Sequence, residues 1–289
     1  MVQHPALPQQ AIEAFAARLG APPVSAGRGA NGPGVAVWED ASLPRAEIEA
    51  LAARWHVDAA LVPAQARLAD YRLLAFDMDS TLITIECIDE MADYAGRKAE
   101  VAAITEAAMR GEIADFDESL RRRVALLAGL DQAVLDRVFR ERLRLSPGAA
   151  ELLAAARTHG LKTLLVSGGF TYFTERLQAD LGLDHAHANT LEVAAGKLTG
   201  RVLGRILNAD GKAQALRDTC RSIGCTTAEA IVLGDGANDL KMMALAGVSI
   251  AYHAKPVVCE QTTWAISHCG LDAVLNLLPT RQQSSGPAH

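Results

Sequence analysis

The strongest chemical signal in this sequence is a pair of aspartates one residue apart. Asp77 and Asp79 follow the apolar run 73–76, whose composition predicts a buried strand. Carboxylates in such a place are costly unless they bind a metal ion or take part in a reaction. Because strict alternation ends with the strand, both side chains can face one pocket, where one carboxylate can attack an electrophile and the other can move a proton. The alternative is a purely structural role, an acidic turn in which Asp79, Ser80 or Thr81 caps a helix.

A second acidic group follows another apolar run. Residues 230–233 predict a buried strand, and Asp235, Asn238 and Asp239 come soon after it. In a parallel sheet the carboxyl ends of the strands lie along one edge, which is where ligands bind. Two acidic strand ends therefore predict one shared cation site.

Two other places could bind an anionic oxygen. Ser167-Gly168-Gly169 follows a predicted strand and opens a predicted helix over 170–181, so a hydroxyl and bare backbone amides could hold a ligand. Lys212, at the start of another predicted helix, can supply a fixed positive charge. An acid pair, a hydroxyl with amides, a lysine and a second acidic group together fit phosphoryl transfer with Mg²⁺, which takes oxygen ligands and balances the charge of a phosphate.

Bulk composition bounds the class of protein. The chain has 289 residues, of which 50% are apolar, so it can form a sizeable core and an insertion or small extra domain. A net charge of −6 does not indicate a positively charged surface for binding nucleic acid. The N-terminal residues lack the pattern of a signal peptide, and no apolar run is long enough to span a membrane, so we expect a cytoplasmic protein. Its five cysteines are then expected to be free thiols.

The alternation of predicted strands and helices favours an α/β fold with a doubly wound parallel sheet. We expect the catalytic core to comprise residues 71–84 and 146–278. Between them, residues 85–145 have a helical pattern, which predicts a helical cap inserted after the first strand motif. Ser146 and Pro147 predict the N-terminus of the helix that follows this cap.

The two ends of the chain lie outside this core. In residues 1–70 we expect a helix over 9–19, a Gly/Pro-rich loop over 21–34, a short strand and a second helix over 44–55, with no clustered catalytic residue types. This segment could be a small, reduced regulatory domain or could mediate a homodimer. The polar tail 279–289 is expected to be disordered.

The ordered set of motifs resembles the haloacid dehalogenase (HAD) superfamily of phosphatases. The shared elements are Asp77-x-Asp79-x-Thr81, Ser167, Lys212 and the stretch from Gly234 to Asp239. Within the superfamily, residues 71 to about 278 resemble the phosphoserine phosphatase family. Three more specific stretches carry that resemblance: residues 85–90, the positions from Phe116 to Val124, and residues 250–256. The resemblance implies a HAD-like, Rossmann-type core and a helical cap that closes as a lid.

The resemblance also implies roles for the acidic residues. Asp77 would be the nucleophile that becomes an aspartyl phosphate. Asp79 would protonate the leaving alkoxide and then activate water. Mg²⁺ would bind Asp77, the backbone carbonyl of Asp79 and Asp235, with Asp239 supporting the site.

Other matched positions would bind the substrate. Four of them would contact the phosphate or the substrate: Ser167, Gly168, Lys212 and Asn238. Glu86 and Arg123 would select the substrate, because an ammonium and a carboxylate require one acid and one planar guanidinium. The alternative for this last pair is an ordinary salt bridge on the surface of the cap.

Taken together, the resemblance predicts a Mg²⁺-dependent phosphatase that hydrolyses O-phospho-L-serine to L-serine and phosphate, the last step of serine biosynthesis. We expect a small-molecule substrate and no nucleic-acid or membrane partner. Two alternatives stay open: a HAD-type phosphatase or phosphotransferase for another small phosphomonoester, and a module that only binds a phospholigand. The intact Asp77 and Asp79 argue against the last, because binding alone needs no nucleophile. Larger relatives often carry a regulatory domain before the core, and residues 1–70 show little of its pattern.

Overall fold

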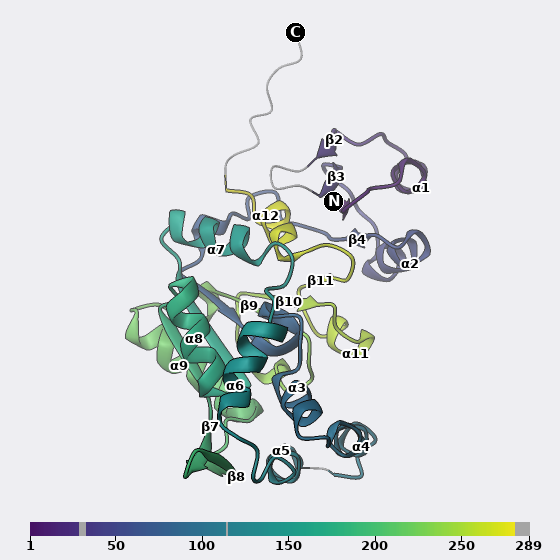
Figure 1. Cartoon of the computed structure of the whole chain (residues 1–289). Helices are drawn as coiled ribbons and strands as arrows, with labels where there is room; N and C mark the ends of the chain where they lie inside the picture. Colours follow the sequence, from purple (N-terminus) through teal and green to yellow (C-terminus); the bar gives the residue numbers. More distant parts are fainter. Residues whose placement is uncertain (29–32, 114, 281–289) are drawn as a thin grey trace.

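A mostly parallel sheet forms the centre of the main body (Figure 1). The computed structural model describes residues 1–28, 33–113 and 115–280. Seven strands lie in the order β11-β10-β9-β5-β6-β7-β8, and among them only β7 and β8 pair in antiparallel fashion. Their bounds are β5 Leu73–Phe76, β6 Lys162–Phe170, β7 His185–Ala194, β8 Lys197–Leu203, β9 Ala230–Gly234, β10 Val248–Tyr252 and β11 Trp264–Ile266.

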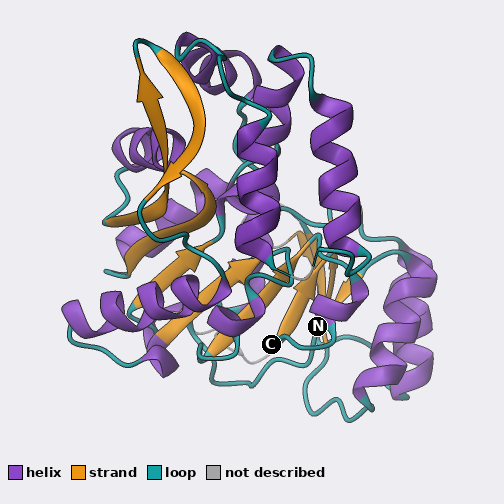
Figure 2. Ribbon diagram, turned by 90° about the horizontal axis from the view of Figure 1, so that it is seen from below, coloured by secondary structure: helices purple, strands orange, loops and turns teal. Residues whose placement is uncertain are grey.

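The central strands are buried on both faces, which explains their unbroken apolar sequences. Alternate residues of β5 enter different cores: Leu74 and Phe76 pack into one apolar cluster, whereas Leu73 and Ala75 pack into the other. Figure 2 shows the strands side by side with helices packed around them. These helices are α7 Ala149–Thr158, α8 Thr171–Leu181, α9 Ala209–Ser222, α10 Leu240–Met243, α11 Pro256–Cys259 and α12 Val274–Leu277. The predicted doubly wound α/β fold is confirmed.

A block of helices is inserted between β5 and α7, and we call residues 85–145 the cap segment. Its helices are α3 Cys87–Tyr94, α4 Lys98–Met109, α5 Phe116–Ala125 and α6 Ala133–Arg137. The segments at its two ends pair with each other through an isolated antiparallel bridge between Ile83 and Leu145. The β7–β8 hairpin supports it from the sheet, since Leu198 N donates to Leu130 O at 2.9 Å. No helix in the described part of the chain combines the length and apolar character needed to cross a membrane.

A smaller unit precedes the main body. Its elements are β1 Val2–His4, α1 Gln9–Leu19, β2 Ser25–Arg28, β3 Gly34–Val37, α2 Arg45–Trp55 and β4 Asp58–Ala59. The four strands form an antiparallel sheet in the order β2-β3-β1-β4. This is the βαββαβ arrangement of ferredoxin-like units. We call residues 1–59 the N-terminal unit.

The expectation of a loop over residues 21–34 was wrong, because β2 lies within that range. All four residues of β2 are exposed, so the strand lacks the apolar alternation that marks a buried face. Its pairing with β3 is a tertiary contact that the local sequence pattern does not predict. The rest of that expected loop includes residues 29–32, and most of the expected disordered tail is 281–289; both ranges lie outside the described residues.

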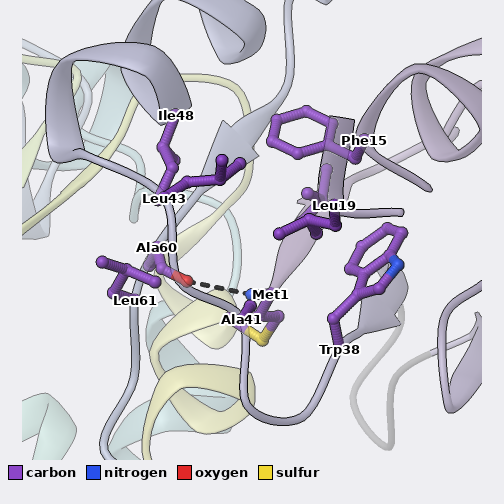
Figure 3. Close-up of a pocket in the computed structure, with 10 residues that line it drawn as sticks. Met1, Phe15, Leu19, Trp38, Ala41, Leu43, Ile48, Ala60 and Leu61 are labelled. Atoms are coloured by element: carbon purple, nitrogen blue, oxygen red, sulfur yellow. Dashed lines mark hydrogen bonds between the residues drawn. The ribbon is translucent and has the colours of Figure 1, made fainter. Parts of the chain in front are cut away.

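Apolar side chains fill the core of the N-terminal unit (Figure 3). Phe15, Leu19 and Trp38 lie around a cavity of about 20 Å³ that Ile48 also lines. That volume is about the size needed for one water molecule and is too small for an amino acid. This cavity therefore cannot serve as the site of a regulatory amino acid without rearrangement.

The starts of helices α7 and α8 differ from expectation. α7 begins at Ala149 and not at Pro147, because Gly148 adopts a left-handed φ of 76° where a side chain would collide with Asp272. The strand β6 continues through Ser167 to Phe170, so α8 begins only at Thr171. The Ser167-Gly168-Gly169 stretch is therefore a strand end with an irregular register and not the opening of a helix.

Asp58 joins the N-terminal unit to the main body. This residue is 4% exposed, and its carboxylate accepts hydrogen bonds at 2.7–3.2 Å from the backbone N–H groups of Ser267, His268 and Cys269. Arg45 adds two hydrogen bonds to backbone carbonyls at the end of α11 and in the loop beyond it. The loop after β11 is thus held by one buried carboxylate.

Replacing Asp58 should loosen this junction. We expect Asp58→Ala to lower the free energy of unfolding by about 2–3 kcal/mol, because several partly buried N–H groups lose their acceptor. Urea unfolding followed by circular dichroism would measure the loss. Asp180→Ala, at an exposed position on α8, is the control and should stay within about 0.5 kcal/mol of the parent. Equal, small effects of both changes would contradict the anchoring role.

Candidate active site

Three neighbouring strands bring the predicted site residues to one edge of the large sheet. Asp77 follows β5, Asp235 follows β9, and Ser167 lies in the last part of β6. These strands are adjacent in the order β9-β5-β6. Asp77 N donates to Leu233 O at 2.9 Å, so the two acidic strand ends are held together by the sheet itself. Ligands in folds of this kind bind at this edge.

Asp77, Asp235 and Asp239 form an acidic cluster. One oxygen from each carboxylate lies within 4.8 Å of the chosen oxygens of the other two. Thr81 Oγ1 donates to Asp235 Oδ1 at 3.1 Å and so orients this carboxylate. Gly234 allows the tight turn, since a Cβ there would lie 2.6 Å from Asp239 Oδ2. Three clustered carboxylates are the donor set that a hard divalent cation prefers.

The surroundings of these carboxylates favour a cation. Burial raises the pKa of Asp235 to about 6, and the nearby Asp239 adds to the rise. Burial and the charge of Asp239 also raise the pKa of Asp77 well above the usual range. A divalent cation bound between them would stabilise the ionised forms that burial and mutual repulsion disfavour. The residues present therefore fit a metal ion.

Lys212 lies buried beside this cluster. Its side chain is 1% exposed, and Nζ donates to Asp77 Oδ1 at 2.8 Å and to Asp239 Oδ1 at 2.7 Å. Burial alone would lower the pKa of Lys212, but the two carboxylates raise it overall. The ammonium therefore stays charged. Lys212 lies three residues inside α9 and not at its start, because Asn208 is the N-cap residue of that helix.

Asp79 has different surroundings from Asp77. It is not one of the three clustered carboxylates, and its Oδ1 accepts a hydrogen bond from Cys87 N at 3.0 Å. Burial raises the pKa of Asp79 to about 6, against the opposing effect of the hydrogen bonds from Cys87. Only glycine fits opposite it, since a Cβ on Gly169 would lie 2.7 Å from Asp79 Oδ2. A carboxyl group with this pKa can both give and take a proton near neutral pH.

Ser167 and Gly168 present polar groups at the end of β6. Ser167 is 1% exposed, and its Oγ accepts from Gly169 N at 2.8 Å. Asn189, buried in β7, donates from Nδ2 to Gly168 O at 2.8 Å and accepts from Leu207 N at 2.7 Å. This side chain therefore ties the strand end to the loop that leads into α9.

Glu86 and Arg123 come from the cap segment. Ser80, whose φ is 54°, donates from Oγ to Glu86 Oε1 at 2.7 Å. Glu86 is solvent-accessible yet crowded by protein, and this desolvation, with the charge of Asp79, raises its pKa to about 7. Desolvation lowers the pKa of Arg123, although Glu86 acts in the opposite direction. Among the described residues no ion pair within 4.0 Å joins Glu86 to Arg123.

Asn238, a predicted site residue, lies half-buried in the loop after β9, beside Gly236. Two other residues that shape this site were not predicted from the sequence. Asn189 was missed, and no signal marks it, because a buried strand asparagine acquires its partners only from the fold. Asn208 was also missed, although an asparagine just before a helix is a recognised N-cap signal.

Known proteins resemble this chain in sequence and in structure. A model of the haloacid dehalogenase-like hydrolases matches residues 74–244. A phosphoserine phosphatase of Polaromonas sp. is 58% identical over 216 residues, which cover 73% of this chain and 92% of that protein. The unliganded probable phosphoserine phosphatase of Vibrio cholerae aligns with a TM-score of 0.80 and 37% identity over 96% of this chain and 85% of that one. A substrate-bound phosphoserine phosphatase complex aligns with a TM-score of 0.68 and 37% identity over 72% of this chain and 98% of that one.

Asp235→Asn should separate electrostatic repulsion from metal binding. In chelator the variant should be at least as stable as the parent, because one carboxylate of the cluster loses its charge. With Mg²⁺ at about a hundredfold excess over its dissociation constant, the parent should gain about 2.7 kcal/mol of stability. The variant should gain less than about a third of that, since a ligand is lost. Urea unfolding with chelator and with Mg²⁺ tests this, with Asp180→Asn as the control that keeps the full gain. A full gain in Asp235→Asn would remove Asp235 from the cation site.

Proposed function

The chain belongs to the haloacid dehalogenase-like hydrolase family, and we propose that it is a Mg²⁺-dependent phosphatase that hydrolyses O-phospho-L-serine to L-serine and inorganic phosphate. One observation carries the proposal: two carboxylates at one strand end have different surroundings. Burial raises the pKa of both, but Asp77 lies in the acidic cluster and contacts the Lys212 ammonium at 2.8 Å. Asp79, whose pKa is raised to about 6, lies outside that cluster and accepts a hydrogen bond from Cys87 N at 3.0 Å. Carboxylates separated in this way can divide the roles of nucleophile and proton carrier. The relatives named as phosphoserine phosphatases support the choice of substrate.

The first half-reaction transfers the phosphoryl group to the enzyme. A carboxylate oxygen of Asp77 attacks phosphorus, and the bond between phosphorus and the serine oxygen breaks. Asp79 gives its proton to the departing alkoxide, so L-serine leaves with a neutral hydroxyl. The hydroxyl of Ser167, the backbone N–H of Gly168 and the ammonium of Lys212 hold the phosphoryl oxygens. The product is an aspartyl phosphate on Asp77.

The second half-reaction regenerates the enzyme. Asp79, now a carboxylate, takes a proton from water while the water oxygen attacks phosphorus. The bond between phosphorus and the Asp77 oxygen breaks, phosphate leaves, and Asp77 returns as a carboxylate. Asp79 is protonated again, so protons balance over the cycle.

The acidic cluster is the proposed metal site. Asp77 and Asp235, supported by Asp239, would hold Mg²⁺ together with the backbone carbonyl of Asp79. When bound, Mg²⁺ supplies positive charge that stabilises the transferring phosphoryl group.

Substrate selection is assigned to the cap segment. Glu86 would pair with the ammonium of phosphoserine and Arg123 with its carboxylate, while Asn238 would contact the substrate or its phosphate. Residues 85–145 would act as a lid over a catalytic core made of 71–84 and 146–278. The same proposal assigns the enzyme to the cytoplasm and to the last step of serine biosynthesis.

Phosphate release from O-phospho-L-serine, with Mg²⁺ and with chelator, tests the function directly. Asp77→Asn should lower turnover by about 10⁴- to 10⁶-fold, because an amide is a poor nucleophile. Its unfolding midpoint should change little, which would show that the fold is intact. A phosphoenzyme trapped on the parent should carry its label on Asp77. A label on Ser167 or Cys87 would refute the mechanism.

Glu86→Gln and Arg123→Lys test the choice of substrate. Each should lower kcat/KM for phosphoserine by about tenfold to a hundredfold, which is what a charge-assisted hydrogen bond of about 1.5–3 kcal/mol contributes. An aryl phosphate, which lacks the ammonium and carboxylate, should be nearly indifferent to both changes. Glu118→Gln and Arg122→Lys are matched controls, because these side chains form an exposed pair on α5. Parallel losses on both substrates would mean that Glu86 and Arg123 support the lid or the phosphate.

A further inference from the structure

One side chain joins helix α9, which carries Lys212, to the cap segment. We propose that Asn208 is a positioning residue that couples closure of the cap segment to the placement of Lys212, through a hydrogen bond to Asp117. The inference rests on the proposed function, in which Lys212 binds the phosphoryl group and the cap segment closes over it.

Asn208 controls the first turn of α9. Its Oδ1 accepts hydrogen bonds from Asp210 N at 3.1 Å and Gly211 N at 3.2 Å. Its backbone carbonyl accepts from Lys212 N at 2.8 Å. The direction of this turn, and with it the base of the Lys212 side chain, depends on this residue.

The other end of the same amide reaches the cap segment. Nδ2 of Asn208 donates to Asp117 Oδ1 at 3.0 Å, across 91 residues of sequence. The orientation of the amide is fixed, because its oxygen already faces two backbone donors and only its nitrogen can donate to a carboxylate. The side chain of Asp117 is 22% exposed, and the guanidinium of Arg121 lies 3.8 Å from its other oxygen, Oδ2. Asn208 is therefore the shorter and more directional partner of Asp117.

The helix that carries Asp117 also covers the strand end that would bind phosphate. Phe116, the preceding residue, lies so close to Gly168 that a Cβ there would be 3.1 Å from its ring. Arg123 lies further along the same helix, α5. Opening of the contact between Asn208 and Asp117 would therefore loosen a helix that carries both a cover for the phosphate and a substrate-selecting group.

The competing explanation is that Asn208 only caps α9. Capping needs an acceptor, which aspartate supplies as well as asparagine does. The contact with Asp117 needs a donor, which aspartate lacks. Asn208→Asp should therefore keep the cap of α9 and place two carboxylates against each other across the contact.

Exchanging the two side chains isolates the contact. Asn208→Asp should raise KM for phosphoserine about fivefold to tenfold with kcat within about twofold, because the closed state is less populated. This change is smaller than the losses expected for Glu86→Gln and Arg123→Lys, because the contact between Asn208 and Asp117 is partly exposed. Asp117→Asn alone should change KM by about twofold or less, since its amide oxygen still accepts. The double variant Asn208→Asp/Asp117→Asn should return to within about twofold of the parent, because Asn at 117 can donate to Asp at 208.

Amide hydrogen exchange without substrate gives a readout that is independent of turnover. In Asn208→Asp, peptides from α5 should exchange about fivefold to tenfold faster, while those from α9 should be unchanged; the double variant should restore α5. If the parent hydrolyses phosphoserine but Asn208→Asp matches it in KM and in exchange, the coupling is wrong. Failure of the double variant to recover would also overturn it. If α5 exchanges faster in Asn208→Asp than in the parent but the parent does not hydrolyse phosphoserine, the contact stands and the proposed function is refuted.

Discussion

The contact between the buried Lys212 ammonium and the carboxylates of Asp77 and Asp239 is the constraint on which the site depends. Three carboxylates cannot gather at the end of β5 and β9 without positive charge, because burial disfavours each ionised form and their charges repel one another. The ammonium of Lys212 supplies a positive charge that is part of the protein itself, at 2.7–2.8 Å from two of the carboxylates. The position of α9 against the sheet is therefore set by where its lysine must reach. A metal ion can then be added to or removed from the cluster without leaving it wholly uncompensated.

Close packing of polar groups is the second requirement, and glycine meets it. Gly169 lets Asp79 approach β6, and Gly234 lets Asp239 fold back beneath its own loop. At both places a Cβ would lie less than 3 Å from a carboxylate oxygen. The left-handed φ of Ser80 belongs to the same pattern, since it turns the chain after Asp79 and aims its hydroxyl at Glu86. Such departures from relaxed geometry concentrate where side chains must converge.

Sequence reasoning succeeded where one strand or one motif carries the information. β5 and β9 were predicted because both faces of each strand are buried, which leaves an unbroken apolar run, and the acids that follow mark the strand ends. It failed where a second segment decides the outcome. β2 exists only through its pairing with β3, and the strand end at Ser167 extends because β7 pairs alongside it. The same limit hid Asn189, whose two partners lie on two other chain segments, β6 and the loop before α9.

The arrangement of supports along the sheet separates two influences on the site. The N-terminal unit attaches through Asp58 to the loop after β11, at one edge of the order β11-β10-β9-β5-β6-β7-β8. The cap segment rests on the hairpin β7–β8 at the other edge, and the two regions lie at opposite ends of the molecule (Figure 1). The acidic cluster sits between them, on β5 and β9. The contact between Asn208 and Asp117 joins the cap segment directly to the first turn of α9, the helix that carries Lys212. The N-terminal unit reaches the cluster by two other routes, the chain that runs from β4 into β5 and the loop after β11, which two strands separate from β9. Of the two regions, the cap segment is therefore the one in direct contact with the helix that carries Lys212.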